Sequence, residues 1–156
     1  MGRYEGWLRH AIVRFKYEEE WARADHLSAA LAETLRTWCD LDALVPVPLH
    51  PERQGRRGYN QSALLAKGAG KLLAMPVLPA LQRIRATPHQ VGLRAEERRR
   101  NVQDAFAVSS GANLVGKRLV LVDDVTTTGS TLGACAEALL AGGACEVRAV
   151  TLARET

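Results

Sequence analysis

Apolar residues in the first 40 positions recur at helical spacing. Residues 6–16 carry Trp7, Leu8, Ile12, Val13 and Phe15 among basic residues, which predicts a first helix. From about Glu18 to Cys39, apolar positions recur at intervals of three, four or six and form one stripe of Trp21, Leu27, Leu31, Leu35 and Trp38. Aromatic residues at this spacing are more typical of a core than of a base-stacking surface, which usually lies on sheets or loops. Residues 1–40 are therefore predicted to be an N-terminal helical part.

The remainder of the chain, 41–156, alternates short apolar runs with helical patterns. The runs predict strands at 44–48, 76–81, 106–108, 119–122 and 147–152, and the helical patterns fall at 60–74, 95–102 and 131–141. Leu132, Ala136, Leu139 and Leu140 are the inward positions expected for the last helix. Alternating strands and helices indicate a parallel sheet with helices on both faces. We therefore predict a single α/β domain over 1–156, with 41–156 as its core.

Two polar segments interrupt this alternation. Residues 49–62 are rich in Gly and Arg, and a loop of this length in a compact domain is usually functional or disordered. Residues 83–93 are polar and contain Pro88 and Gly92, so we predict a mobile excursion there.

Composition limits the class of protein. The 156 residues fit one compact domain, with 47% hydrophobic and 24% charged residues. No apolar run reaches membrane-spanning length, and the first residues lack the apolar segment of a secretion signal. Cys39, Cys135 and Cys145 show no CxxC spacing, which argues against a disulfide framework or a zinc site. We expect a cytoplasmic protein with reduced thiols and no membrane insertion.

The basic residues are clustered although the net charge is only +4. One group consists of Arg53, Arg56 and Arg57, and the other of Arg83, Arg85, Arg94, Arg98, Arg99 and Arg100. Such clusters attract polyanions, either pyrophosphate or nucleic acid. A solvated basic face remains an equal alternative.

The most informative stretch begins with the apolar run 119–122. Two carboxylates, Asp123 and Asp124, follow it directly, and open α/β sheets bind ligands at this end of their strands. The next residues are small and mostly carry hydroxyls, and a helical pattern begins behind them. Backbone N–H groups at a helix N-terminus favour anions. The stretch thus offers acceptors for sugar hydroxyls beside donors for a phosphate, which suits a ribose 5-phosphate. An ordinary helix cap needs one hydroxyl and explains neither the paired acids nor the other hydroxyls.

This stretch resembles the phosphoribosyl pyrophosphate (PRPP) signature of type I phosphoribosyltransferases. The resemblance implies that fold, a mainly parallel central sheet with helices on both faces. It also implies that Asp123 and Asp124 bind the ribose 2- and 3-hydroxyls. The 5-phosphate would then contact Thr126, Thr127, Thr128, Gly129, Ser130 and Thr131.

Further motifs extend the resemblance over nearly the whole chain. They are Tyr4-x-Gly6-x-Leu8-Arg9, Val45-Pro46-Val47-Pro48, Arg57-Gly58-Tyr59-Asn60-Gln61, Gln90-x-Gly92-Leu93 and Arg98-x-x-Asn101-Val102-x-x-Ala105-Phe106. This ordered set is similar to the ComF family, whose members are competence-associated, amidophosphoribosyltransferase-like proteins. ComF proteins often begin with a cysteine zinc ribbon, and this sequence starts where that module would end. It is therefore expected to be either a trimmed chain or a member that lacks the ribbon.

The resemblance also assigns residues to the leaving group. It places a pyrophosphate loop at Pro48, Leu49 and His50, with Arg56 and Arg57 close behind. It makes 83–90 a flexible lid with Arg83 and Arg85 as its cations, so that the expected catalytic set is Asp123, Asp124, Arg83 and Arg85. Mg²⁺ would arrive with PRPP and contact Asp123 and Asp124 directly or through water. The alternative for His50 and His89 is a plain loop residue, and the alternative for Arg57 is a solvated arginine at a helix entry.

The function implied is transfer of a phosphoribosyl group to an unknown acceptor with release of pyrophosphate. Some purine transferases carry an Asp base in the middle of the loop, whereas this chain has Thr127, so purine-salvage chemistry of that kind is not expected. Two alternatives stay open: a PRPP- or nucleotide-binding protein without turnover, and a single-stranded DNA-binding factor in DNA uptake. Neither the acceptor nor a homodimer can be assigned at this level.

Overall fold

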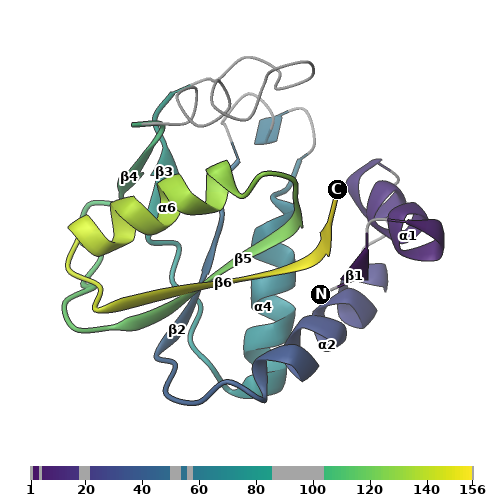
Figure 1. The fold of residues 1–156 in the computed structure, drawn as a ribbon, viewed down its shortest axis with the longest axis horizontal. Helices are drawn as coiled ribbons and strands as arrows, with labels where there is room; N and C mark the ends of the chain where they lie inside the picture. The colour runs from purple at the N-terminus through teal and green to yellow at the C-terminus, as the bar shows by residue number, and fades with distance from the viewer. Residues whose placement is uncertain are drawn as a thin grey trace.

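The fold is built around a parallel sheet with helices on both faces, as predicted (Figure 1). The computed structural model describes residues 2–3, 5–17, 22–49, 54–55, 58–85 and 104–155. Within them the central sheet has the strand order β1-β6-β5-β2, and every neighbouring pair is parallel. Its strands are β1 (Gly2–Arg3), β2 (Ala43–Pro46), β5 (Arg118–Thr126) and β6 (Glu146–Arg154). A second, antiparallel pair consists of β3 (Leu81–Arg83) and β4 (Phe106–Val108).

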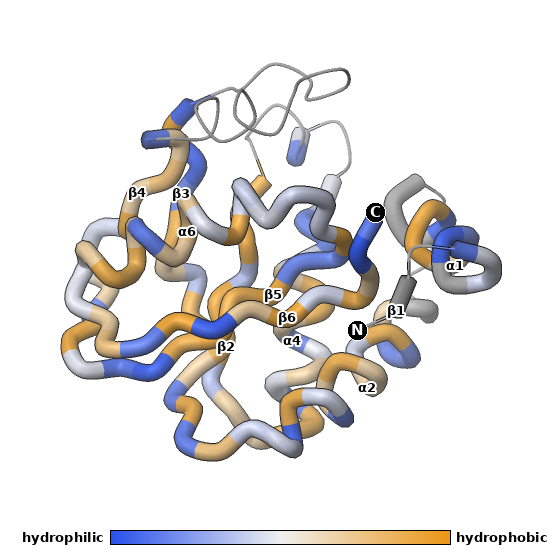
Figure 2. Tube along the Cα trace, in the orientation of Figure 1, coloured by the Kyte–Doolittle hydropathy of each residue, from blue (hydrophilic) through white to orange (hydrophobic). Residues whose placement is uncertain are grey.

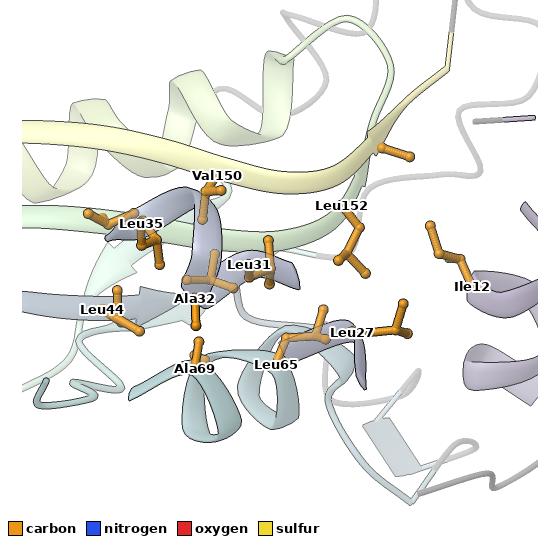
Figure 3. Packing of buried hydrophobic residues seen from close by; sticks show 14 residues of the cluster. Ile12, Leu27, Leu31, Ala32, Leu35, Leu44, Leu65, Ala69, Val150 and Leu152 are labelled. Carbon is orange, nitrogen blue, oxygen red and sulfur yellow. The ribbon is translucent and has the colours of Figure 1, made fainter. Parts of the chain in front are cut away.

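One face of the sheet is covered by α2 (Ala22–Leu35) and α4 (Gln61–Leu73), with α1 (Gly6–Tyr17) at its edge. Side chains alternate along a strand, so Val120 and Val122 of β5 point to this face. They pack with a cluster that includes Leu31 and Leu65 and reaches Ile12 on α1 (Figure 3). This apolar layer fixes the helices against the sheet, because buried aliphatic side chains each contribute about 1.5–3 kcal/mol.

The opposite face is covered by α6 (Ser130–Ala141) and the β3–β4 pair. Leu119 and Leu121 of β5 point to this side and pack with Cys135 and Leu139 of α6. Burial raises the pKa of the Cys135 thiol far above its ordinary value. Hydrophobic positions accordingly gather where β2, β5 and β6 cross the middle of the molecule (Figure 2).

The helical expectations hold with two corrections. Leu27, Leu31 and Leu35 are buried, as the stripe predicts, but α2 ends at Leu35 rather than near Cys39. The chain turns there, with the Thr37 amide bonded to the Thr34 carbonyl. Leu140 was expected to point inward from α6, yet it is 47% exposed, because Cys135 and Leu139 occupy the buried face at i, i+4. Trp21 and the predicted helix 95–102 lie outside the described residues.

The strand expectations need more revision. The predicted strand 76–81 is wrong, because only Val77 makes a single bridge, to Leu44, before β3 begins at Leu81. Pro76 and Pro79 have no N–H to donate, which prevents a continuous ladder. Arg83, predicted to open a mobile segment, instead closes β3. β1 was not predicted within the first 40 residues, since two residues carry no periodic signal.

No helix in the part of the chain that the structure describes is long and apolar enough to cross a membrane.

The contact between α2 and α4 allows a stability prediction at Gly68. A Cβ at Gly68 would lie 2.6 Å from the Cβ of Ser28, whereas a Cβ at the helical Gly133 would meet no atom within 4 Å. Gly68→Ala is expected to lower the free energy of unfolding by about 1–3 kcal/mol through overpacking. Gly133→Ala, the matched control, should raise it by roughly 0.5–1 kcal/mol through helix propensity. Urea unfolding measures both, and a stabilised Gly68→Ala variant would contradict the packing of α2 on α4.

Candidate functional site

The two signature acids lie near the carboxyl end of β5. β2 ends opposite Val122, whereas β6 continues alongside and pairs Asp123 with Thr151. Among the described residues, β5 therefore has no paired strand on its β2 side at the two acids. Asp124 is buried, at 7% exposure, and its Oδ1 accepts a hydrogen bond of 2.6 Å from the Val125 amide. Asp123 is half-buried, and its Oδ1 accepts from the Asp124 amide at 2.9 Å.

The first turn of α4 holds Asp123 from the open side. The Ser62 hydroxyl donates a hydrogen bond of 2.7 Å to Asp123 Oδ1, and Ser62 itself is buried. Sequence reasoning missed Ser62 as a site residue, because its contact spans 61 positions and no local pattern marks it.

Asn60 explains why α4 begins at this point. Its Oδ1 caps the helix by accepting from the amides of Ser62 and Ala63, at 2.9 and 3.4 Å. Its Nδ2 donates to the Val47 carbonyl at 3.0 Å, just past the end of β2. One side chain therefore caps the helix and ties its first turn to the strand end beside the acids.

The hydroxyl-rich loop leads from β5 into α6. Gly129 occupies the N-cap position with a φ of +78°, a left-handed conformation that suits glycine. No side-chain hydrogen bond caps the helix at this residue, and its first turn carries no acid. The Thr128 and Ser130 hydroxyls form a hydrogen bond of 2.7 Å, in which either oxygen can be the donor. The first turn of α6 therefore presents backbone amides and hydroxyls. No acidic residue in that turn neutralises the positive end of the helix dipole.

Arg83 is anchored on the α6 side of the sheet. Its guanidinium carbon lies 5.4 Å from the centre of the Phe106 ring, on the paired strand. The charges of Asp123 and Arg83 both act on the buried Cys135 thiol, where Asp123 raises the pKa and Arg83 lowers it. Both charges therefore act on the α6 side of the sheet, although they come from different elements. Arg85, the second cation expected on the lid, is exposed two residues beyond β3.

The expected pyrophosphate loop is only partly described. Pro48 and Leu49 are half-buried directly after β2, next to the strand that carries the acids. His50, Arg56 and Arg57 lie outside the described residues, as do Arg53, His89, Arg94 and 98–100. Their assigned roles stay predictions.

Among the described residues of the site, the side chains that could hold a metal are the carboxylates and hydroxyls. No group of three or more His, Cys, Asp or Glu side chains that could hold a metal occurs among the residues described. Asp123 and Asp124 nevertheless fit Mg²⁺, which is usually held by one or two carboxylates together with substrate phosphates and waters. A ligand that brings its own phosphates would complete such a shell.

A cavity of about 580 Å³ lies at the other end of the strands, lined by residues that include Asp42, Pro76, Asn113 and Lys117. Two of the polar side chains that line it, Asp42 and Asn113, already accept hydrogen bonds from backbone amides. Asp42 Oδ2 accepts from the Arg118 amide at 2.6 Å, and this bond holds the pKa of the Asp42 carboxyl below its ordinary value. Asn113 Oδ1 accepts from the Val115 amide at 3.3 Å. We therefore place the candidate site at the carboxyl end of β5.

The chain is similar in sequence to known proteins. The sequence model of the phosphoribosyl transferase domain matches residues 68–156. Competence protein F of Haemophilus influenzae is 36% identical over 99% of this chain and 71% of its own length. DNA utilization protein YhgH of Escherichia coli O157:H7 is 41% identical over a region that covers 72% of this chain and 49% of that relative.

The fold has solved counterparts as well. The glutamine PRPP amidotransferase of B. subtilis, solved with ADP and GMP, superposes with a TM-score of 0.54 and 22% identity. The alignment covers 83% of this chain and 26% of that one, and at this identity it establishes the fold alone.

Proposed function

Because the chain belongs to the phosphoribosyl transferase domain family, in its ComF branch with Competence protein F, we propose that it binds PRPP at the carboxyl end of β5. The phosphoribosyl group is then transferred to an acceptor still to be identified. The observation that carries the proposal is Asp123, held by Ser62 at 2.7 Å beside a hydroxyl loop that opens α6. Carboxylate oxygens there suit the ribose hydroxyls. The first-turn amides and hydroxyls of α6 suit the 5-phosphate.

The transfer breaks the bond between ribose C1 and pyrophosphate and forms one between C1 and the acceptor. The departing pyrophosphate keeps the bonding electron pair, and positive charge develops on the ribose, as in glycoside hydrolysis. Asp123 and Asp124 orient the sugar through its hydroxyls. Arg83 packs on the Phe106 ring and lies on the α6 side of the sheet, where its charge acts on Cys135 together with that of Asp123. Its guanidinium is suited to bind the departing pyrophosphate.

Mg²⁺ is the metal this proposal includes. When bound with PRPP it would neutralise charge on the pyrophosphate, and Asp123 and Asp124 are the residues that would hold it.

A calorimetric titration with PRPP and Mg²⁺ tests the proposal. Saturable binding that exceeds binding of ribose 5-phosphate and of pyrophosphate separately is the expected result, because the two halves of PRPP engage different elements. Equal binding of PRPP and pyrophosphate would refute the ribose site. Release of pyrophosphate, followed with a coupled assay across candidate acceptors, then separates transfer from binding without turnover.

Binding without turnover is the second candidate, and Thr127 favours it. This half-buried residue occupies the loop position at which some purine transferases carry an Asp base, and a threonine hydroxyl does not act as a base at neutral pH. A PRPP sensor needs the same ribose and phosphate contacts but no acceptor. Tight PRPP binding with no pyrophosphate release for any acceptor is the result expected for a sensor.

Ser62 provides a prediction specific to the positioning of Asp123. Ser62→Ala removes the donor to Asp123 Oδ1, and we expect PRPP affinity to fall roughly 5- to 20-fold, since a hydrogen bond to a charged group contributes about 1.5–3 kcal/mol, part of which water restores. Ser62→Thr keeps the hydroxyl and should retain most of the affinity. Calorimetry measures all three proteins, and equal affinity of Ser62→Ala and the wild type would remove Ser62 from the site.

A further inference from the structure

The cavity at the amino end of the strands takes no part in the transfer proposed above. It has a volume of about 580 Å³ and reaches from Asp42, just before β2, to Lys117, just before β5. Residues from the segments 76–80 and 109–113 complete its lining. A volume of this size is in the range that takes a small organic molecule. Because the signature acids lie near the other end of β5, a ligand in this cavity would occupy a second site.

The walls of the cavity are fixed by backbone hydrogen bonds. On one side, the Leu44 amide of β2 donates to the Pro76 carbonyl at 2.9 Å, and the Leu78 amide donates back to the Leu44 carbonyl at 2.8 Å. On the other side, the Ser109 amide donates to the Ala80 carbonyl at 2.8 Å. The cavity is therefore preformed, and a ligand does not have to order its walls, a cost that would otherwise oppose binding.

Lys117 is the cation of the cavity. Its side chain is half-buried, and it forms no ion pair with any residue that the structure describes. The neighbouring Arg118 is engaged by two carboxylates, since its guanidinium nitrogens lie 3.6 Å from Asp40 Oδ2 and 3.6 Å from Asp42 Oδ2. Lys117 is therefore the group that would meet an anionic ligand.

Asp42 limits the charge that the cavity accepts. The hydrogen bond from the Arg118 amide, together with the charges of Arg118 and Lys117, holds the pKa of the Asp42 carboxyl below its ordinary value, so this carboxyl is negative at neutral pH. The described lining thus carries one positive and one negative charge. A phosphate dianion would be repelled by Asp42, whereas a carboxylate brings the single charge that Lys117 balances.

Apolar side chains line much of the rest of the cavity. Ala43 and Ala80 are buried, and Leu78 is half-buried. Asn113 adds a polar donor, because its Oδ1 accepts from the Val115 amide while its Nδ2 makes no hydrogen bond among the described residues. The lining therefore combines a cation and an amide donor with an apolar wall.

We propose that this cavity binds a small monocarboxylate with an apolar body, in which Lys117 and the Asn113 amide hold the carboxylate and Leu78 contacts the apolar part. Donors placed beside an apolar surface fix the orientation of such a molecule. The site does not depend on PRPP binding, because the two sites lie at opposite ends of β5.

A calorimetric titration with phenylacetate tests the site, since this molecule joins one carboxylate to an apolar ring. Saturable binding to the wild type is expected, and Lys117→Met should weaken it roughly tenfold through loss of the charged donor. Lys71→Met is the matched control, because Lys71 is exposed in the last turn of α4 and does not line the cavity. It should bind phenylacetate like the wild type. Absence of saturable binding, or equal affinity of Lys117→Met and the wild type, would overturn the proposal.

Three further titrations separate charge, ligand class and position. Phenylacetamide, which has the same shape without the charge, should bind roughly tenfold more weakly than phenylacetate. Inorganic phosphate should not displace phenylacetate, and displacement would overturn the assignment to carboxylates. Asp123→Asn/Asp124→Asn should bind phenylacetate like the wild type, whereas a loss there would move the ligand to the PRPP end of β5. PRPP affinity should be unchanged in Lys117→Met, so failure of one site is distinguishable from failure of the other.

Discussion

The double variant Asp123→Asn/Asp124→Asn is expected to lose PRPP affinity by a factor of about 100 or more while remaining folded. Each carboxylate that accepts a hydrogen bond from a ribose hydroxyl contributes about 1.5–3 kcal/mol, and two such losses correspond to at least a hundredfold. Calorimetry with PRPP and Mg²⁺ measures the loss. Wild-type affinity in the double variant would show that the acids do not hold the ribose.

The fold should survive because asparagine preserves the shape and the acceptor oxygen of each residue. Ser62 can still donate to an amide oxygen at position 123, and the Val125 amide can do the same at position 124. Removing charge from the buried position 124 also removes a desolvation cost. Circular dichroism and urea unfolding should therefore stay close to the wild type.

Asp42→Asn is the matched control for the acid pair. Asp42 lies just before β2, beside the amino end of β5, where the Arg118 amide and side chain bind it. It has the same chemistry as Asp123 but lies at the opposite end of the strands. PRPP affinity is expected to be unchanged in Asp42→Asn, and an equal loss in both variants would indicate a general charge effect.

The signature segment could be predicted from the sequence because its parts are close along the chain. An apolar strand, two acids, a hydroxyl loop and a helix follow in order from Arg118 to Ala141, and the structure places them as β5 and α6. The predicted parallel sheet was confirmed for the same reason, since strand and helix periodicities are local properties. Strand limits were less predictable, because pairing with β6 extends β5 to Thr126, through both acids.

Features set by distant contacts could not be predicted. Ser62 meets Asp123 only because the first turn of α4 packs against the end of β5. Arg83 looked like the start of a loop, yet pairing with Phe106 makes it the end of a strand. Each of these outcomes depends on tertiary packing, and the periodic pattern of one segment carries no information about contacts with distant segments.

Gly129→Ala is expected to weaken PRPP binding roughly 10-fold or more and to lower stability by about 1–2 kcal/mol. At the φ of +78° that Gly129 adopts, any other L-residue is strained by about 1–2 kcal/mol. A Cβ at this position would touch no atom within 4 Å, so the strain is conformational and not steric contact with a neighbour. The loop relieves that strain by changing its backbone, which turns the first-turn amides of α6 away from the phosphate.

Two companion variants make this prediction specific to backbone conformation. Gly129→Asn should recover part of the affinity, since asparagine tolerates the left-handed region better than alanine. Gly133→Ala, one turn further along α6 and with open space for its Cβ, should bind PRPP like the wild type. Calorimetry on the three variants gives the order Gly133→Ala, Gly129→Asn, Gly129→Ala from strongest to weakest. If Gly129→Ala bound PRPP as tightly as Gly133→Ala, the phosphate would have to be held by groups other than the amides that this glycine positions.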